Sequence, residues 1–543
     1  MKFRATWQRL FHVVLTTLLI VLCSWQVCNA DEITLQLKGG GGFQISGRLR
    51  AFDGQKYTII NASFGEMEVD AKRFTCTAGS CPSKKTQPPL RETDLFSDGN
   101  IAEITVAGSN TIGNQLMPNL IRAFAAKLKL QVQQIARADP LSMEFRFFNG
   151  AGANVARIIL HRKGSRSSFS SLKAGKAQIG MSSRPVKNAE VTDLLKAGLG
   201  DVRSAASEHI VALDGIVVIT SPENPILSMS IDSIAKVFSG QITDWSQFGY
   251  PPGLIKVHAP SPSSGTWETF NSLVLKPRGL RLAENTRRTG NHSKQSDWVA
   301  ADPLSIGVVG IAYQRSAKPL NIKTDCGLIT PPVNFAIKTE EYALSRRLYL
   351  YTPNQLENRM AARFLDFALS REAQTVIRKA HFVDQSPELI SFKEQASRIA
   401  FALNAPEKDF KMPLMRELLT DLKNAERSTL TFRFESGSIS LDRKSQKDIT
   451  SLAIAMDDGS LKNKTIKLLG FADSGGLFEA NRQLSLSRAQ TVRDELIKKL
   501  KKQIPPSRLI VRGYGELAPI ACNNTPSSRA YNRRVEVWVD QDQ

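Results

Sequence analysis

The chain is poor in the residues and motifs that common catalytic and metal sites need. Only six histidines occur among its 543 residues, and they lie far apart, without the spacing of metal ligands. There is no Gly-x-Ser-x-Gly elbow, no Walker phosphate loop and no His-Glu-x-x-His motif. Ser109 and Ser264 have no base that the sequence places beside them. We therefore expect a protein that is not an enzyme and that holds no metal and no cofactor.

Long apolar runs are also scarce. After Val13–Cys23 no stretch approaches the roughly 20 residues that a membrane-spanning helix needs. That first run follows three basic residues and ends shortly before Ala30, so residues 1–30 read as a signal peptide cleaved after Ala30. Leu22 is bulkier than a lipoprotein cleavage site allows before Cys23, which argues against a lipid anchor. We expect an exported mature chain without a transmembrane segment.

Acidic residues are in deficit. The chain has 51 Asp and Glu against 72 Lys and Arg, a formal net charge of +21. Loss of the three basic residues of the signal peptide lowers this charge to +18. Such a surface favours anionic wall or outer-leaflet material, or acidic ligands. Nucleic acid is not an expected partner, because an exported chain rarely meets it.

Cysteine is rare as well, with six residues of which two leave with the signal peptide. Cys76 and Cys81 enclose the short segment Cys-Thr-Ala-Gly-Ser-Cys and predict a disulfide in an oxidising compartment. A zinc site is the alternative, but no further Cys or His clusters near them. Cys326 and Cys522 are isolated, and no role is assigned to them.

Shifts in composition divide the mature chain. Residues 31–81 alternate polar and apolar positions among glycines, which predicts a small β-rich module, and residues 82–100 read as a proline-containing linker. Strands alternate with helices over residues 101–391, which predicts a large α/β domain. Residues 392–427 are expected to form a charged helical spacer before the last domain, residues 428–543.

Four motifs follow one another in the last domain. Residues 470–473 read Gly-Phe-Ala-Asp, 481–488 read Asn-Arg-Gln-Leu-Ser-Leu-Ser-Arg, 513–516 read Gly-Tyr-Gly-Glu, and 532–536 read Asn-Arg-Arg-Val-Glu. This order resembles the OmpA-like family of peptidoglycan-binding domains, although Phe-Ala replaces the family's His-Thr. The resemblance implies an α/β sandwich that binds diaminopimelate in the peptidoglycan stem peptide. It also implies the periplasm of a Gram-negative bacterium, with the cell wall and outer membrane nearby.

The charges in these motifs suit such a ligand. Asp473 falls on the turn after a strand-like segment, and Arg488 falls in the first turns of a helix. A guanidinium can hold a carboxylate bidentately, and a carboxylate can hold an ammonium, so the pair can bind a zwitterion. A structural salt bridge is the alternative for an isolated pair, but the surrounding motifs favour binding. The predicted peptidoglycan-binding residues are Asp473, Asn481 and Arg488.

The large α/β domain carries a second ordered set of motifs. Residues 106–111 read Val-Ala-Gly-Ser-Asn-Thr, 179–185 read Ile-Gly-Met-Ser-Ser-Arg-Pro, 264–266 read Ser-Gly-Thr, and 306–310 read Ile-Gly-Val-Val-Gly. Over most of residues 101–390 the chain resembles a phosphate-type periplasmic substrate-binding protein, the solute receptor of an ABC transporter. The resemblance implies a two-lobed type II binding-protein fold, in which a ligand bridges the lobes.

Elementary chemistry explains why these loops suit an oxyanion. Ser and Thr lie at expected helix starts, where free N–H groups and the positive end of the helix dipole favour an anion. Service as simple helix N-caps is the alternative for isolated examples. The predicted oxyanion-binding residues are Ser109, Asn110, Thr111, Ser182, Ser183, Arg184, Ser264, Gly265 and Thr266.

Three positions depart from the phosphate receptors. Pro260 stands where the family usually has an Arg, Ser183 stands where it often has an Asp, and Ala151 stands where it frequently has a Ser. These departures weaken the expectation of tight, phosphate-selective binding. Arg184 either restores the missing charge or is a salt-bridged surface residue. The expected ligand is therefore an oxyanion, with phosphate as one candidate.

Two functions of different classes follow for this α/β multidomain chain. The first is a periplasmic, wall-tethered receptor that captures an oxyanion for an ABC permease or an envelope sensor. The second is a structural or interaction protein that uses a degenerate receptor fold as a wall-held platform. Ser109, Thr111 and the Ser-Gly-Thr loop favour the receptor, whereas Pro260, Ser183 and Ala151 favour the platform. A cleft that closes on a small ligand would support the receptor, and a filled cleft would support the platform.

Overall fold

The computed structural model describes residues 32–38, 44–52, 56–61, 65–79, 101–404, 410–434 and 441–541. The predicted signal peptide, the predicted linker and Cys81 lie outside these residues. The chain divides into two compact units, Met1–Asp94 and Leu95–Gln543, which are described separately. None of the helices in the described ranges has the length and apolar character needed to span a bilayer.

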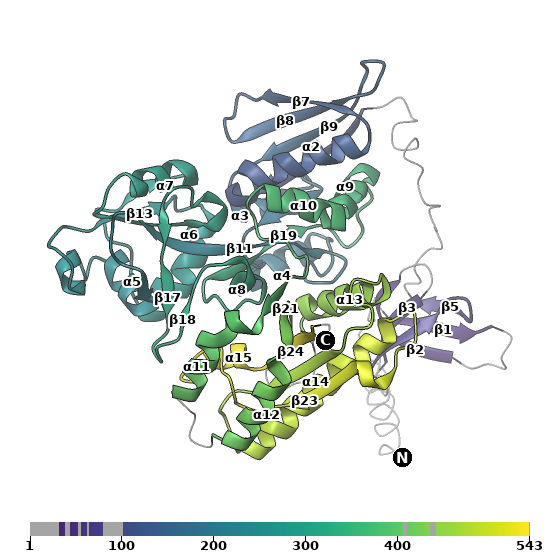
Figure 1. Cartoon of the computed structure of the whole chain (residues 1–543). Helices are drawn as coiled ribbons and strands as arrows, with labels where there is room; N and C mark the ends of the chain where they lie inside the picture. Colours follow the sequence, from purple (N-terminus) through teal and green to yellow (C-terminus); the bar gives the residue numbers. More distant parts are fainter. Residues whose placement is uncertain are drawn as a thin grey trace, which may run out of the picture. The chain divides into compact units, whose positions relative to one another are not determined.

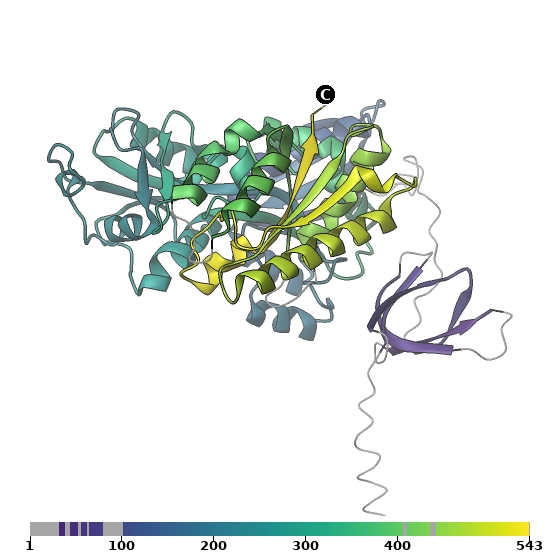
Figure 2. The ribbon, with the colours of Figure 1, turned by 60° about the horizontal axis from the view of Figure 1, so that its bottom comes forward.

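The first unit contains an antiparallel five-stranded sheet in the order β4-β3-β2-β1-β5. Figure 2 shows this sheet, in purple, as a strongly curved ribbon. Alternate residues such as Ile33, Leu35, Tyr57 and Ile59 point inward and form its core. Cys76 is disulfide-bonded. The strands are β1 (Glu32–Leu37), β2 (Gln44–Phe52), β3 (Lys56–Asn61), β4 (Gly65–Asp70) and β5 (Phe74–Gly79).

The second unit begins with two lobes that share one long mixed sheet (Figure 1). Lobe 1 forms around strands whose apolar residues are buried under helices on both faces, as parallel strands require. Its strands are β6 (Ala102–Gly108), β7 (Gln131–Ala136), β8 (Ser142–Phe148), β9 (Asn154–His161) and β10 (Ile179–Ser182). Its helices are α2 (Met117–Lys127), α3 (Ser165–Lys173), α4 (Asn188–Lys196), α9 (Arg359–Leu369) and α10 (Arg371–Lys379).

Lobe 2 has its own apolar core and a second, small sheet. Its main strands are β13 (Lys256–Pro260), β14 (Arg287–Thr289), β15 (Ser305–Gly310) and β16 (Lys318–Pro319). The small sheet comprises β12 (Ser228–Ser230), β17 (Asn321–Lys323) and β18 (Ile329–Thr330). The helices are α5 (Ile231–Phe238), α6 (Gly265–Phe270), α7 (His292–Ala300) and α8 (Asn334–Lys338).

Two antiparallel strands connect the lobes. They are β11 (Glu208–Thr220) and β19 (Ser345–Tyr351). The first part of β11 pairs with β19, which in turn pairs with β10 of lobe 1, and the last part of β11 pairs with β15 of lobe 2. A change in the angle between the lobes must therefore pass through these two strands.

The last part of the unit is a five-stranded sheet, in the order β20-β21-β24-β22-β23, between two layers of helices (Figure 1). One face packs on α13 (Arg443–Asp457) and α14 (Phe478–Lys499). The other packs on α11 (Ala396–Asn404) and α12 (Met412–Leu422), which lie in the segment expected as a spacer. The remaining elements are β20 (Leu389–Ser391), β21 (Ala425–Arg433), β22 (Ile466–Phe471), β23 (Leu509–Gly513), β24 (Arg534–Asp540) and α15 (Pro526–Asn532). The predicted α/β multidomain fold class is confirmed.

Candidate functional site

The three predicted oxyanion-binding loops meet between the lobes. Ser109 follows β6, where Gly108 has a φ of +142° and its backbone approaches Met181 too closely for a Cβ. Asn110 and Thr111 open the helix that leads into α2, and Ser264 caps α6, accepting a hydrogen bond from the Thr266 N–H at 3.2 Å. Eight of the nine predicted residues are buried, and Asn110 is half-buried. Ser264 is thus a helix N-cap, as the alternative held, and it also lies where the three loops meet.

Side chains of the two lobes bond directly across the predicted site. The Thr111 and Thr266 hydroxyls lie 3.1 Å apart. A Cβ on Gly265 would lie 2.0 Å from Ser183 Oγ, so only glycine lets α6 approach lobe 1 this closely. The Ser183 and Ser165 hydroxyls also lie 3.1 Å apart. The two lobes are therefore in direct contact, and hydroxyl groups line the interface between them.

Arg184 is salt-bridged, as one alternative held, but it is buried rather than on the surface. Its guanidinium donates to both oxygens of Glu190, at 2.8 and 2.7 Å, and to Glu268 of lobe 2 at 2.8 Å. Lys187 also contacts Glu268. Burial opposes the charged form, but the bonds to Glu190 and Glu268 outweigh it and raise the pKa of Arg184. The Arg184 charge is thus shared between two carboxylates and helps to hold the lobes together.

The residue that sequence analysis missed is Arg346, on the connecting strand β19. Its Nη2 donates to Thr266 Oγ1 at 2.8 Å and to Asp214 at 2.6 Å, and its Nε also donates to Asp214. Nη1 is buried and has no hydrogen-bond partner among the described residues. Burial raises the pKa of Asp214, against the opposing charge of Arg346. The one sequence signal was an Arg-Arg pair opening an otherwise apolar strand, which is weak by itself.

Two aromatic residues complete the surroundings. His292 Nε2 lies 3.3 Å from Ser264 Oγ, and the Tyr313 hydroxyl donates to the Thr111 carbonyl at 2.9 Å. Burial, helped by the charge of Arg346, lowers the pKa of His292 to about 4, so its ring is neutral at pH 7. The site therefore offers hydroxyl donors and one guanidinium, without a second positive charge from His292.

Arg346 also lines an open cavity of about 740 Å³. Lobe 1 contributes Arg184, lobe 2 contributes Glu268, and the C-terminal domain contributes Arg433 and Tyr531 to its walls. The interface between the lobes thus has an open space on one side. Arg346, although buried, therefore borders an open cavity.

The predicted wall-binding residues lie at one end of the C-terminal sheet. Asp473 follows β22, and the Arg533 guanidinium donates to its carboxylate at 2.8 Å. Arg488, on α14, is almost fully buried and stacks 5.3 Å above the Phe434 ring. Burial and the neighbouring Arg533 charge lower the pKa of Arg488, whereas Asp473 raises it. The two predicted charges thus share one neighbourhood with a third, Arg533, which sequence analysis left as part of a strand motif.

Asn481 occupies a different place in this neighbourhood. Its side-chain amide donates to Glu516 at 3.3 Å, and Asn481 itself is buried. Glu516 belongs to the Gly-Tyr-Gly-Glu motif, so the bond joins α14 to the loop after β23. This contact fits a residue that orients the loop beside the charged groups.

Comparisons with known proteins bear on both parts. A family model described as "PBP superfamily domain" matches residues 97–372, and one described as "OmpA family" matches residues 433–533. The phosphate-binding protein PstS of Borreliella burgdorferi is 28% identical over 191 residues, 34% of this chain and 67% of that protein. The resemblances predicted from the sequence are confirmed.

Solved structures give similar matches. A putative phosphate ABC transporter substrate-binding protein with bound phosphate, from Clostridium perfringens, is 24% identical with a TM-score of 0.40, covering 52% of this chain and 99% of that chain. The C-terminal domain of Helicobacter pylori MotB is 30% identical with a TM-score of 0.19, covering 21% of this chain and 84% of that chain.

Proposed function

Because this chain belongs to the PBP superfamily, we propose that it is a wall-anchored receptor that captures a small oxyanion, with phosphate as the first candidate, between its lobes. The observation that carries the proposal is Arg346. Its guanidinium reaches Thr266 in the predicted oxyanion loop and keeps one buried nitrogen without a partner among the described residues. A buried donor without an acceptor costs about 1–3 kcal/mol, which a bound anion would recover.

Arg346 would also supply the positive charge that the family arginine provides and that Pro260 cannot. Arg346 lies on β19 and not in the segment before Ser264, so the positive charge comes from one of the two connecting strands. Asp214 balances that charge, which leaves the hydroxyls of Thr111, Thr266 and Ser183 as neutral donors. The site by itself therefore carries no net buried charge, and it would bind an anion through neutral hydrogen-bond donors and the unpartnered Arg346 nitrogen.

The proposed tether is the C-terminal domain. Asp473 and Arg488 would hold the zwitterionic end of diaminopimelate in the peptidoglycan stem peptide, with Arg533 orienting Asp473. The Cys326–Cys522 disulfide supports an oxidising compartment, consistent with export to the periplasm. A tethered receptor cannot diffuse freely to an ABC permease, so sensing or local scavenging near the outer membrane is the favoured use.

Calorimetric titration of phosphate into the mature chain, after removal of any carried ligand, tests the receptor. We expect a dissociation constant on the order of 1 μM or tighter. Arg346→Gln should weaken binding about 100-fold, because it removes a charged hydrogen-bond donor. Arg347→Gln is the matched control, since Arg347 pairs with Glu340 and Asp442 instead. Absence of heat from phosphate and sulfate with the unaltered chain would contradict the proposal.

The direct bonds between the lobes favour a second candidate, the wall-held interaction platform. Thr111 contacts Thr266 and Arg184 contacts Glu268 across the cleft, which suits a receptor fold fixed in one conformation. On this alternative the unaltered chain gives no heat with any oxyanion, and Arg346→Gln changes only stability. The same titration therefore separates the two candidates.

A further inference from the structure

The two cysteines without a predicted role form a disulfide between lobe 2 and the C-terminal domain. Cys326 lies in the turn between β17 and β18, and Cys522 lies between β23 and α15. Beside it, the Asn524 side chain donates to Asp325 at 3.4 Å. We call residues 520–525 the strap, because they join the two domains at this point.

The other side of the strap reaches the predicted wall-binding turn. Asn523 Oδ1 accepts a hydrogen bond from the backbone N–H of Ser474, the residue after Asp473, at 3.3 Å. Asn532, fully buried, accepts from Ile520 and Ala521 through its oxygen and donates to Asn523 through its nitrogen. The next residue is Arg533, which binds Asp473. The residue that contacts the turn, Asn523, therefore directly follows the disulfide-bonded Cys522.

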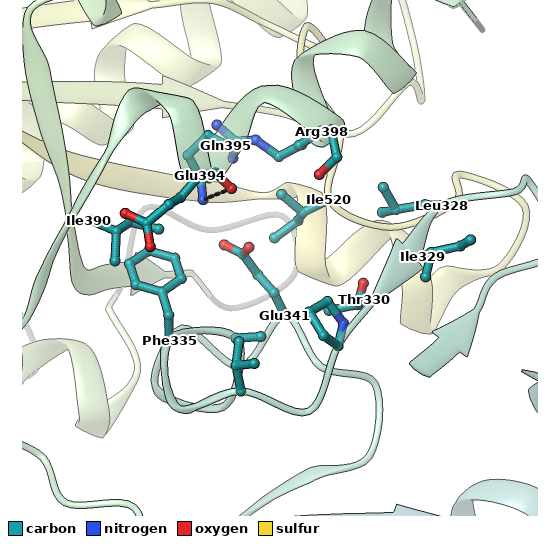
Figure 3. Close-up of a pocket in the computed structure, with 14 residues that line it drawn as sticks. Leu328, Ile329, Thr330, Phe335, Glu341, Ile390, Glu394, Gln395, Arg398 and Ile520 are labelled. Carbon is teal, nitrogen blue, oxygen red and sulfur yellow. Dashed lines mark hydrogen bonds between the residues drawn. The ribbon is translucent and has the colours of Figure 1, made fainter. Parts of the chain in front are cut away.

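Two cavities open near the disulfide. A cavity of about 220 Å³ lies between lobe 2 and the C-terminal domain, and Figure 3 shows Ile520 of the strap facing it together with Leu328 and Glu341. A second cavity, of about 470 Å³, is lined by Cys522 and Asn524. Ile520 and Cys522 are buried, and the disulfide and the Asn524 contact are the bonds that join the strap directly to lobe 2.

We propose that the Cys326–Cys522 disulfide positions the peptidoglycan-binding turn through Asn523, which makes wall attachment sensitive to thiols. This inference rests on the proposed wall-binding function of the C-terminal domain. A dithiol would reduce the bond: two electrons and two protons pass to the cysteine sulfurs, the protein S–S bond breaks, and the dithiol closes into a disulfide. The freed strap would have to be ordered again whenever peptidoglycan binds.

That ordering lowers affinity without removing any group that touches the ligand. Fixing a few mobile backbone and side-chain torsions costs about 1–1.4 kcal/mol, which corresponds to a five- to tenfold loss of affinity. Reduction of the disulfide leaves Asp473, Arg488 and Arg533 chemically unchanged. The strap residues are accordingly positioning residues.

Co-sedimentation of the mature chain with purified peptidoglycan, over a range of peptidoglycan concentrations, tests the inference. We expect the Cys326→Ser/Cys522→Ser variant to bind five- to tenfold more weakly than the oxidised chain. Dithiothreitol should weaken the unaltered chain by the same factor and leave the double variant unchanged. This last comparison separates the strap from the disulfide of Cys76, which is also open to reduction.

A second variant leaves the disulfide intact. Asn523→Ala removes the side-chain contacts to the Ser474 N–H and to Asn532, and should weaken binding to a similar extent. If Asp473→Asn abolishes binding while the double cysteine and Asn523→Ala variants bind like the unaltered chain, the strap inference is wrong. If Asp473→Asn itself still binds, the proposed wall function is wrong instead.

Discussion

Two arginines with different partners decide how the cleft is interpreted. Arg184 lies in the family motif, yet Glu190 and Glu268 occupy its donors. Arg346 lies outside every motif, yet it reaches Thr266 and pairs with Asp214. The partners of a guanidinium, rather than its place in a motif, determine whether it is available to a ligand.

A second substitution at Asp214 should separate the effect of Arg346→Gln on stability from its effect on phosphate binding. Arg346→Gln leaves Asp214 buried without its counter-charge, which should lower the free energy of unfolding by about 3–5 kcal/mol at pH 7. Adding Asp214→Asn removes that charge and should restore much of the stability, but not phosphate binding. Urea denaturation and calorimetry of both variants measure the two effects. Recovery of binding in the double variant would show that Arg346 acts only through Asp214.

His292 predicts a pH dependence of stability. Its folded-state pKa of about 4 lies below the unfolded value near 6.5, so the neutral ring stabilises the fold at higher pH. That contribution is lost as the pH falls from about 6.5 to 4, by up to about 3 kcal/mol. His292→Gln should therefore flatten the decline in unfolding free energy over this range. An identical decline in both proteins would assign the acid sensitivity to other groups.

At the scale of elements, the start of α6 sets how closely the lobes approach. Gly265 packs against Ser183 with no room for a Cβ, whereas Gly150 has open space around it. The close approach of a helix N-terminus to the opposite lobe depends on this single missing methyl group.

Gly265→Ala should hold the lobes apart. Its Cβ would overlap Ser183 Oγ, so we expect a larger radius of gyration by small-angle scattering and at least tenfold weaker phosphate binding. Gly150→Ala, in lobe 1, serves as the control and should leave both quantities unchanged. Unaltered scattering and affinity in Gly265→Ala would mean that Ser183 moves aside without cost.

Local patterns explain which elements could be predicted from the sequence. Ser109, Thr111 and the Ser-Gly-Thr loop could be predicted because consecutive residues show the pattern of a strand, a turn and a helix start. Arg346 was missed because its partner Thr266 lies 80 positions away, and only the folded sheet brings them together. The Cys326–Cys522 pairing spans 196 positions and has no local signature at all.

At the scale of the whole second unit, one buried and one exposed ion pair join the two-lobed part to the C-terminal domain. Arg427, on β21, contacts both Glu341 after α8 and Glu536 on β24, and is fully buried. Arg371 of lobe 1 lies 3.3 Å from Asp458 after α13. The C-terminal domain is thus connected to both lobes.

Arg427→Met tests this connection. The change takes the buried ion pair from Glu341, while Glu536 keeps Arg398 and Arg534, and it should destabilise the chain by about 3–5 kcal/mol. Limited proteolysis should then cut faster between the two-lobed part and the C-terminal domain. Arg416→Met, at an exposed position of α12, should behave like the unaltered chain. Equal cleavage rates for the two variants would contradict a stabilising role for the cluster.

Two adjacent residues of β19 contact the two parts of the second unit, the oxyanion loop and the C-terminal domain. Arg346 reaches the oxyanion loop, while Arg347 pairs with Asp442 at the start of α13 in the C-terminal domain, 2.8 Å away. Thermodynamic reciprocity then applies to any movement of this strand. Whatever factor peptidoglycan imposes on oxyanion affinity, the oxyanion must impose on peptidoglycan affinity, so a movement of this strand would make the wall an effector of the proposed receptor.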